Sequence, residues 1–359
     1  MYLWPVRIFM ICCLCFCLAV TITADEEDEW QTSTPEAQGV DGDLLAAMME
    51  HLEDEEMFFM DGILIVQDGV LIFEEYFSGF DADTVHEVRS VSKSVTSAVV
   101  GIALENDDIE SLDITFAEFF PEYFEDDANA DKTEITLRDL LMMRSGLDWQ
   151  ELRMGIAREG QSNLDQLQQI IRMPLATEPG ETFSYSTADT HLISAIIQAA
   201  TGLSVAEYAE EHLFEPLGIE TYRWATDPQG YTIAGAELSL RPRDMAKIGQ
   251  LYLQSGEWDD EQLIPADWVE VTTAPQDDDV PFYGYHWWIT PNGLFWAEGW
   301  GGQLIIVIPA KQTIIVTTAS SATSPAGIDE RQEQIFSLVA EYILPALPDV
   351  EASMQETES

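Results

Sequence analysis

The sequence predicts an α+β fold, with a central antiparallel sheet flanked by helices and a mainly helical insertion. Three observations lead to this prediction. Apolar, β-branched segments lie near both ends of the chain, the middle third has helical patterns, and a further helix follows the last strands. Strands from the two ends can share one sheet if the helical middle lies to one side of it. A cleft between the two halves is then the natural place for a functional site.

The first predicted elements are a helix over residues 43–53 and a hairpin. The β-rich segments Gly62–Gln67 and Val70–Phe77 are separated by the dipeptide Asp-Gly, which is a strong signal for a two-residue hairpin turn. A second helix is expected from Ser90 to about Glu105, because this segment contains small and β-branched residues and no Pro.

Helix signals continue through the middle of the chain, and strand signals return in its last third. A short helix beginning with Thr136 is expected to end at Ser145-Gly146, and Ser204 opens a capping box before another helix. Three strands and a final helix are then predicted at Leu294–Gly299, Gln303–Pro309, Gln312–Ala319 and Glu330–Leu344.

These elements suggest how the chain is organised. We expect a signal peptide or membrane anchor (1–24), an acidic leader (25–36), an α/β domain from both chain ends (37–115 and 225–345), a helical domain (116–224) and an acidic tail (346–359).

Composition narrows the classes of function. The chain has 359 residues, of which 46% are hydrophobic, so it can build a core and is not wholly disordered. Its 66 acidic and 15 basic residues give a formal net charge of -51, which argues against nucleic acids and anionic membrane surfaces as partners. A salt-rich habitat, in which dense carboxylates stay hydrated and their repulsion is screened, would explain this acidity.

The N-terminus resembles a secretory signal. Arg7 precedes an apolar run over residues 8–22, and small residues near Ala24 would allow cleavage. We therefore expect export to the periplasm or the medium, with anchoring through residues 8–22 as the alternative. The four cysteines all lie in this run, at Cys12, Cys13, Cys15 and Cys17. Cleavage would leave a mature protein without disulfides or thiolate chemistry.

The sequence lacks the patterns that are typical of several kinds of catalytic or binding site. There is no G-x-S-x-G elbow, no H-x-x-x-H or H-x-x-E-H zinc pattern and no glycine loop in a phosphate-binding context. His286 lies among aromatic residues, where packing is the favoured interpretation. We therefore expect no metal and no cofactor.

The motif Ser90-Val-Ser-Lys93 offers nucleophilic chemistry. Residues three apart on a helix share a face, so the Lys93 amine can reach the Ser90 hydroxyl. A serine at a helix N-terminus also lies near partial positive charge. Free lysine has a pKa near 10.4, so burial must hold the amine neutral if it is to act as a base. The small residues that follow Lys93 favour such burial over a solvated surface position.

A second motif makes the pattern more specific. Tyr185 follows the turn at Pro179-Gly180 and lies 95 positions after Ser90. This combination resembles the serine β-lactamase-like, penicillin-recognising hydrolases, in the branch related to class C β-lactamases. The resemblance covers nearly all of residues 35–345, and its further segments are Leu140–Trp149, Gly235–Gly256 and Gly299–Gln303.

The resemblance implies a set of roles. Ser90 matches the nucleophile that forms an acyl-enzyme. Lys93 matches the lysine that accepts its proton or lowers the pKa of the tyrosine, and Tyr185 matches the proton shuttle. The backbone N–H groups of Ser90 and Trp300 would form the oxyanion hole. Expected substrate-binding residues are Thr187, Gly299, Gly301 and Trp149.

Two departures from the family pattern bear on the substrate. Thr187 replaces the Asn of Y-x-N, and Ala297, followed by Glu298, stands where Lys or His normally meets a substrate carboxylate. We therefore expect a small neutral or cationic ester or amide, as in the esterase and 6-aminohexanoate-dimer hydrolase branch. The alternatives are β-lactamase or D-amino-acid peptidase activity, acyl transfer, or a non-catalytic binding relative. The sequence does not predict the oligomeric state.

Overall fold

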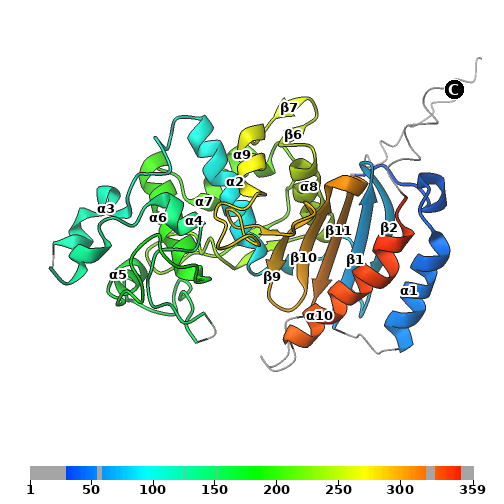
Figure 1. The fold of residues 1–359 in the computed structure, drawn as a ribbon, viewed down its shortest axis with the longest axis horizontal. Coiled ribbons are helices and arrows are strands. Elements are labelled where there is room, and N and C mark those ends of the chain that lie inside the picture. The colour runs from blue at the N-terminus through cyan, green and yellow to red at the C-terminus, as the bar shows by residue number, and fades with distance from the viewer. Residues whose placement is uncertain (1–29, 55–58, 126, 152, 321–327, 349–359) are drawn as a thin grey trace, which may run out of the picture.

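The computed structural model describes residues 30–54, 59–125, 127–151, 153–320 and 328–348. The predicted signal segment 1–24 lies outside these residues, as do residues 25–29 of the acidic leader and residues 349–359 of the acidic tail. Figure 1 shows two parts side by side, a large sheet with its covering helices and a mainly helical region.

The strands form one large antiparallel sheet, a small sheet of three strands and a hairpin. The large sheet has the order β2-β1-β11-β10-β9-β8, the small one has the order β3-β5-β4, and β6 pairs with β7. The strands are β1 (Met60–Gln67), β2 (Val70–Tyr76), β3 (His86–Glu87), β4 (Arg223–Trp224), β5 (Leu238–Leu240), β6 (Glu257–Trp258), β7 (Glu261–Gln262), β8 (Trp288–Ile289), β9 (Phe295–Gly299), β10 (Gln303–Ile308) and β11 (Thr313–Ala319).

Helices account for most of the other regular structure. The α-helices are α1 (Gly42–Asp54), α2 (Val91–Glu105), α3 (Phe116–Phe119), α4 (Leu137–Leu141), α5 (Gln166–Ile171), α6 (Thr187–Thr201), α7 (Val205–Ala209), α8 (Pro242–Leu253), α9 (Ala266–Thr272), α10 (Ile328–Leu338) and α11 (Leu344–Ala346). Short 3-10 helices lie at Glu36–Gln38, Pro121–Phe124, Asp127–Lys132 and Pro309–Lys311, and π-helical turns lie at Glu210–Phe214 and Val339–Ile343.

The predicted α+β class is confirmed, and the large sheet does join both chain ends. β1 pairs with β2 across the Asp-Gly turn and with β11 on its other side, so residues 60–67 lie beside residues 313–319. Antiparallel pairing of such distant segments requires the intervening chain to leave the sheet and return. The helices between residues 116 and 214 lie in the part of the molecule away from the sheet (Figure 1).

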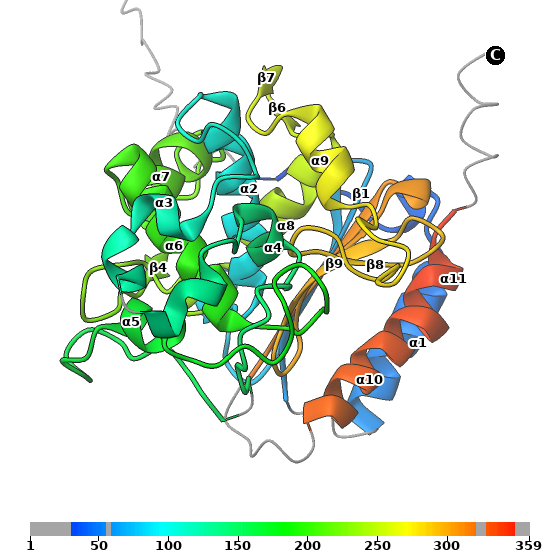
Figure 2. The same cartoon turned by 60° about the vertical axis from the view of Figure 1, so that its left-hand side comes forward.

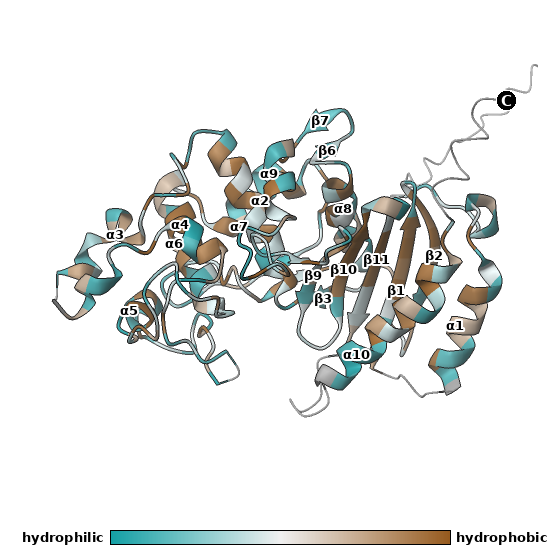
Figure 3. Cartoon of the chain, viewed as in Figure 1, coloured by the Kyte–Doolittle hydropathy of each residue, from teal (hydrophilic) through white to brown (hydrophobic). Residues whose placement is uncertain are grey.

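Side-chain alternation along the strands explains the two cores. Ile63 and Ile65 belong to a cluster with α1 and α10, whereas Leu64 and Val66 belong to a cluster with α2 and α8. Successive residues of a strand point to opposite faces, so a strand covered on both faces is apolar throughout. Figure 2 shows α1, α10 and α11 together on one side of the sheet, and in Figure 3 the buried strands are largely coloured as hydrophobic.

One predicted element boundary is wrong. The helix that begins after the Thr136 cap ends at Leu141 and does not reach Ser145-Gly146. Met143 adopts a left-handed backbone with φ 57°, which ends the helix. Ser145 is bound instead to the buried carboxylate of Asp189 in α6, through its hydroxyl at 2.7 Å and its backbone N–H at 3.3 Å.

No single helix in the described ranges is long and apolar enough to cross a bilayer. Only α6 taken together with Val205–Phe214 meets the length and composition test, and these two segments are bent by 72°.

Candidate active site

Ser90 lies where a strand turns into a helix. The segment before it is fixed to the small sheet, since β3 pairs with β5 and the Val88 N–H donates to the Leu238 carbonyl at 2.8 Å. Arg89 then adopts φ 53°, a left-handed conformation that is costly for a residue with a side chain. This turn makes Ser90 the N-cap residue of α2, and its side chain makes no capping hydrogen bond. Its hydroxyl is therefore available to the pocket that it lines.

Lys93 lies one turn further along α2 and is only 1% exposed. Its Nζ lies 3.0 Å from Ser90 Oγ, 2.9 Å from Thr187 Oγ1 and 2.8 Å from the Gly235 carbonyl. None of these three partners carries a charge. The predicted contact between the amine and the Ser90 hydroxyl is thus present in the structure, and two further elements hold the amine in place.

The electrostatics of this position favour a neutral amine. Burial lowers the pKa of Lys93 to about 8, because removal from water disfavours the charged form. The nearby carboxylates of Glu151 and Asp189 act in the opposite direction and raise it. At mildly alkaline pH a large fraction of Lys93 is therefore unprotonated and able to accept a proton.

Tyr185 lines the same pocket as Ser90 and lies next to Lys93. Its half-buried ring has the Lys93 Nζ 4.9 Å from its centroid and is stacked on Trp288, with ring centroids 5.8 Å apart. Burial raises the pKa of Tyr185 well above its usual value, and a hydrogen bond with the Ser90 side chain opposes this only in part. Tyr185 is thus a neutral phenol, and the Ser90 hydroxyl has both an amine and a phenol within reach.

The N-terminus of α6 positions Tyr185 and Thr187. Ser186 is the N-cap, and its hydroxyl contacts the buried Asp189 carboxylate at 2.6 Å. The same carboxylate binds Ser145, which links the Arg-Ser-Gly segment to α6. Arg144 then binds the Pro-Gly turn, since its carbonyl accepts the Gly180 N–H at 2.8 Å. The Arg-Ser-Gly segment and the Pro-Gly turn therefore hold the N-terminus of α6 in place.

Strand β9 brings its last residue against the turn that carries Ser90. A Cβ at Gly299 would lie 2.2 Å from the Val88 carbonyl oxygen, so only glycine permits this approach. Trp300 follows, lines the pocket and is 37% exposed. The backbone N–H groups of Ser90 and Trp300 donate to none of the carbonyls in the turns and loops of the described ranges. Both therefore remain candidates for an oxyanion hole.

Ser90, Tyr185, Thr187 and Trp300 line a pocket of about 550 Å³. Its walls combine apolar side chains with carboxylates, and Arg89 is the one cation among the described lining residues. Arg89 is itself paired with Glu87 at 2.7 Å. The lining is Arg89, Ser90, Glu151, Met154, Gly155, Ile156, Tyr185, Thr187, Ile233, Ala236, Glu237, Trp288, Glu298, Trp300 and Gln332.

The remaining predicted site residues lie at different distances from this pocket. Gly299 and Gly301 flank Trp300 but do not line the pocket, and Trp149 belongs to the hydrophobic core. The Trp149 indole N–H donates to Glu151 Oε2 at 2.5 Å. His286 is buried, and its Nδ1 lies 3.0 Å from the Lys93 carbonyl. Burial lowers the pKa of His286 to about 3, so it packs as a neutral ring.

Sequence reasoning missed Glu151. Its carboxylate lines the pocket and binds both the hydroxyl and the backbone N–H of Thr187, at 2.5 Å and 2.8 Å. A single glutamate carries no signal in a chain with 66 acidic residues. Among the described residues, no group of three or more His, Cys, Asp or Glu side chains could hold a metal ion.

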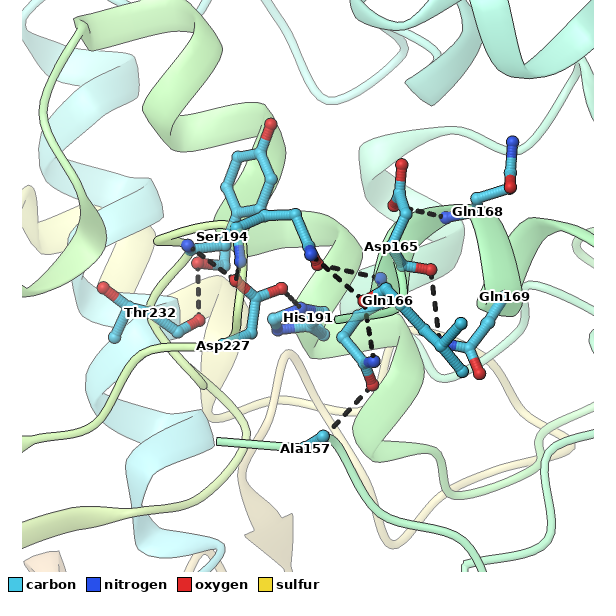
Figure 4. Close-up of polar contacts among 12 residues, drawn as sticks. Ala157, Asp165, Gln166, Gln168, Gln169, His191, Ser194, Asp227 and Thr232 are labelled. Carbon is cyan, nitrogen blue, oxygen red and sulfur yellow. Dashed lines mark hydrogen bonds and ion pairs between the residues drawn. The ribbon is translucent and has the colours of Figure 1, made fainter. Parts of the chain in front are cut away.

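A polar network holds the loop that contributes Glu151, Met154 and Ile156 to the pocket. Gln166 Oε1 accepts the Ala157 N–H, and Gln229 Oε1 accepts the Gln166 N–H. Asp227 accepts the Gln229 N–H at 2.8 Å and contacts His191 Nε2 of α6 at 2.9 Å (Figure 4). The pocket loop is therefore tied to the helix whose N-terminus carries Thr187.

The chain is similar to known proteins over most of its length. A sequence profile of the family described as Beta-lactamase matches residues 45–340. The 6-aminohexanoate-dimer hydrolase of Paenarthrobacter ureafaciens is 26% identical over 318 residues, which cover 80% of each chain. A D-aminopeptidase of Brucella anthropi is 27% identical over 200 residues, covering 52% of this chain and 37% of the other.

Solved structures show the same fold. The structure titled "Putative 6-aminohexanoate-dimer hydrolase from Bacillus anthracis" superimposes with a TM-score of 0.70. It is 24% identical in sequence, and the match covers 84% of this chain and 83% of that one.

Proposed function

The chain belongs to the beta-lactamase family, and on that premise we propose that it is a serine hydrolase that cleaves a small ester or amide through an acyl-enzyme on Ser90. The observation that carries the proposal is the triple contact of Lys93, whose buried amine lies 3.0 Å from the Ser90 hydroxyl. A lysine without a charged partner in such a position has a lowered pKa and can serve as a base.

Acylation follows from this geometry. As Ser90 Oγ attacks the substrate carbonyl carbon, its proton passes to Lys93 Nζ, and the carbonyl electrons move to oxygen. The N–H groups of Ser90 and Trp300 stabilise that oxyanion, with each donor contributing roughly 3–4 kcal/mol in comparable sites. Tyr185, a neutral phenol, donates its proton to the leaving group and regains one from the protonated Lys93.

Deacylation uses the same groups in reverse. Water attacks the acyl carbon and gives a proton to Tyr185 as Tyr185 passes its own phenol proton to the neutral Lys93 amine. Lys93 then gives a proton to Ser90 Oγ when the ester bond breaks. The sequence left open whether Lys93 acts as the base or lowers the pKa of Tyr185. The lowered pKa of Lys93 and the raised pKa of Tyr185 support the first of these roles.

The pocket favours neutral or cationic substrates. Ala297 is buried, and Glu298 lines the pocket next to it, where relatives with K-T-G carry a cation. Glu237 and Glu151 add two more carboxylates, and Arg89 is already paired. A substrate carboxylate would therefore meet repulsion, which disfavours β-lactams and peptidoglycan stem termini. Met154, Trp288 and Trp300 supply an apolar surface for the acyl chain.

The test is turnover by wild type and by Ser90→Ala. The substrates are p-nitrophenyl esters and anilides in matched pairs, ending in an ammonium, a neutral group or a carboxylate. We expect Ser90→Ala to lose turnover with an unchanged thermal transition, and the carboxylate-ended substrates to be the poorest. Near wild-type activity in Ser90→Ala would overturn the nucleophile assignment. A preference for carboxylate-ended substrates would overturn the substrate class.

A further inference from the structure

Glu151 forms a second layer of hydrogen bonds behind Lys93. Its Oε1 accepts the Thr187 hydroxyl at 2.5 Å, and its Oε2 accepts the Thr187 backbone N–H at 2.8 Å. The Trp149 indole N–H also donates to Oε2, at 2.5 Å. Three donors from two elements therefore fix the orientation of this carboxylate, although Glu151 does not touch Lys93.

This layer determines the direction in which the Thr187 hydroxyl donates its proton. An ionised carboxylate can only accept hydrogen bonds, so the single hydroxyl proton of Thr187 is directed to Glu151. Toward Lys93 Nζ, 2.9 Å away, the Thr187 oxygen can then only accept. The other partner of Nζ, the Gly235 carbonyl at 2.8 Å, is also an acceptor by its chemistry.

The three hydrogen-bond partners of Lys93 fix the direction of its lone pair. A neutral amine has two N–H donors and one lone pair. Both donors are required by Thr187 and Gly235, so the lone pair is left for the third neighbour, the Ser90 hydroxyl at 3.0 Å. The amine is thus oriented as a base toward Ser90 before any substrate binds.

We propose that Glu151 is a positioning residue that directs the Lys93 lone pair to Ser90 by holding the hydroxyl proton of Thr187. The inference rests on the proposed function, because it concerns the base of that reaction. In the acylation step the proton leaves Ser90 Oγ for Lys93 Nζ as the bond from Oγ to the acyl carbon forms. Glu151 and Thr187 neither gain nor lose a proton in that step.

The charge of Glu151 gives a second, separable effect. The titratable groups that face Lys93 are Glu151 from the pocket loop, Asp189 and Tyr185 from the start of α6, and His286. Glu151 and Asp189 both raise the pKa of Lys93. Removing the Glu151 charge should therefore move the acid limb of the rate profile to lower pH.

The decisive variant is Glu151→Gln. Its amide oxygen can still accept the Thr187 and Trp149 N–H groups, and its NH₂ then faces the Thr187 oxygen. The hydroxyl must turn its own proton toward Lys93, where it competes with Ser90 for the lone pair. We expect kcat/KM to fall about 100-fold, in the range of general-base effects, with KM little changed and the acid limb at lower pH. A merely structural role would lower activity by the same factor whether or not residue 187 carries a hydroxyl.

A double-mutant cycle with Thr187→Val tests the route through Thr187. Thr187→Val has no hydroxyl proton that could turn toward Lys93. Glu151→Gln should therefore lower kcat/KM by a several-fold smaller factor in the Thr187→Val background than in wild type. Thr187→Asn should restore most of the rate, because its carbonyl can accept from Lys93 while its NH₂ donates to Glu151. Glu237→Gln is the matched control, since it removes the same charge from the pocket without touching Thr187, and its acid limb should stay at the wild-type pH.

The outcomes separate this inference from the proposed function. If Ser90→Ala is inactive and Glu151→Gln keeps the plateau rate of wild type, the positioning role is overturned and the hydrolase proposal stands. Additive effects of Glu151→Gln and Thr187→Val would also overturn it. Phosphonylation of Ser90 in Glu151→Gln by a fluorophosphonate, together with an unchanged thermal transition, would confirm that the variant is folded.

Discussion

The environment of Lys93 decides the chemistry at the residue scale. Its three neighbours are a hydroxyl, a second hydroxyl and a carbonyl, and none of them carries a charge. A buried ammonium without a counter-ion in contact is costly, so the folded protein favours the neutral amine. Two predictions follow from this single position, one for the rate and one for stability.

The rate should depend on the protonation of Lys93. Burial lowers its pKa to about 8, so kcat/KM for a neutral ester should rise with pH and level off above about pH 8. Stopped-flow or steady-state rates between pH 6 and pH 10 would measure this limb. Tyr185→Phe should be slower but should keep the limb in place, because the phenol of Tyr185 stays protonated over this range. A rate that is flat from pH 6 to pH 10 would contradict the assignment of the base.

Lys93→Met should stabilise the protein at neutral pH while abolishing turnover. The pKa of Lys93 falls from its usual 10.5 to about 8 on folding, which corresponds to a cost of about 3 kcal/mol. The cost is fully present below pH 8, where both states are protonated, and fades as pH rises to 10.5. Lost hydrogen bonds offset part of it, so we expect a gain of about 2 kcal/mol at pH 7. Urea denaturation at pH 7 and pH 9.5 would measure the difference, and a variant that is less stable than wild type at pH 7 would contradict this account.

Close contact between elements assembles the site from distant segments. The end of β9 touches the turn before α2, and the Gly235 segment touches both α2 and the start of α6. Gly299 and Gly235 each lie where a side chain would meet a neighbour, at the Val88 carbonyl and at Thr187 respectively. The geometry around Ser90 therefore depends on glycines that have no reactive side chain themselves.

Gly299→Ala tests this dependence. An added Cβ would lie 2.2 Å from the Val88 carbonyl oxygen, so β9 and the turn that carries Ser90 must separate. We expect a loss of about 2 kcal/mol of stability and at least 10-fold in kcat, measured by thermal denaturation and ester hydrolysis. Gly155→Ala is the control for stability, because no atom lies within 4 Å of its Cβ position. A Gly299→Ala enzyme with the stability and the rate of wild type would refute the close approach.

Local patterns predicted several of the elements, and contacts between distant segments explain some of the exceptions. The hairpin, α2 and the last three strands each follow from a turn, a cap or a run of β-branched residues within the segment. The early end of α4 does not, because it depends on Asp189 binding Ser145 from 44 positions away. Neither do the two-residue strands β3, β4, β6, β7 and β8, which are too short to carry a pattern of their own.

The candidate site divides in the same way. Ser90 and Lys93 share one helical turn, and Tyr185 was found by its spacing in a family motif. Gly235 and Glu151 were not assigned from the sequence, because each acts through a backbone carbonyl or a second hydrogen bond that only the folded chain brings to Lys93. Thr187, which stands in place of the family's Asn, lies between Glu151 and Lys93 and contacts both.

At the scale of the whole molecule, the net charge of -51 makes the stability of the folded state depend on salt. Repulsion among so many carboxylates destabilises the compact state, and salt screens it over a Debye length of about 10 Å at 0.1 M and about 3 Å at 1 M. We predict that the thermal transition rises by about 5 °C or more between 0.1 M and 1 M NaCl. Sucrose at equal osmolality is the control for exclusion effects and should raise it less. A transition that falls or stays constant with NaCl would contradict this account of the acidity.

The proposed mechanism requires that Ser90 carry the acyl group during turnover. The most direct measurement is mass spectrometry of protein quenched with acid during hydrolysis of a p-nitrophenyl ester, followed by peptide mapping. We expect an added acyl mass on Ser90 in the peptide that contains it, with none on the neighbouring Ser92 and Ser94 and none in Ser90→Ala. Turnover without any adduct when deacylation is slowed by Tyr185→Phe, or an adduct on another residue, would contradict it.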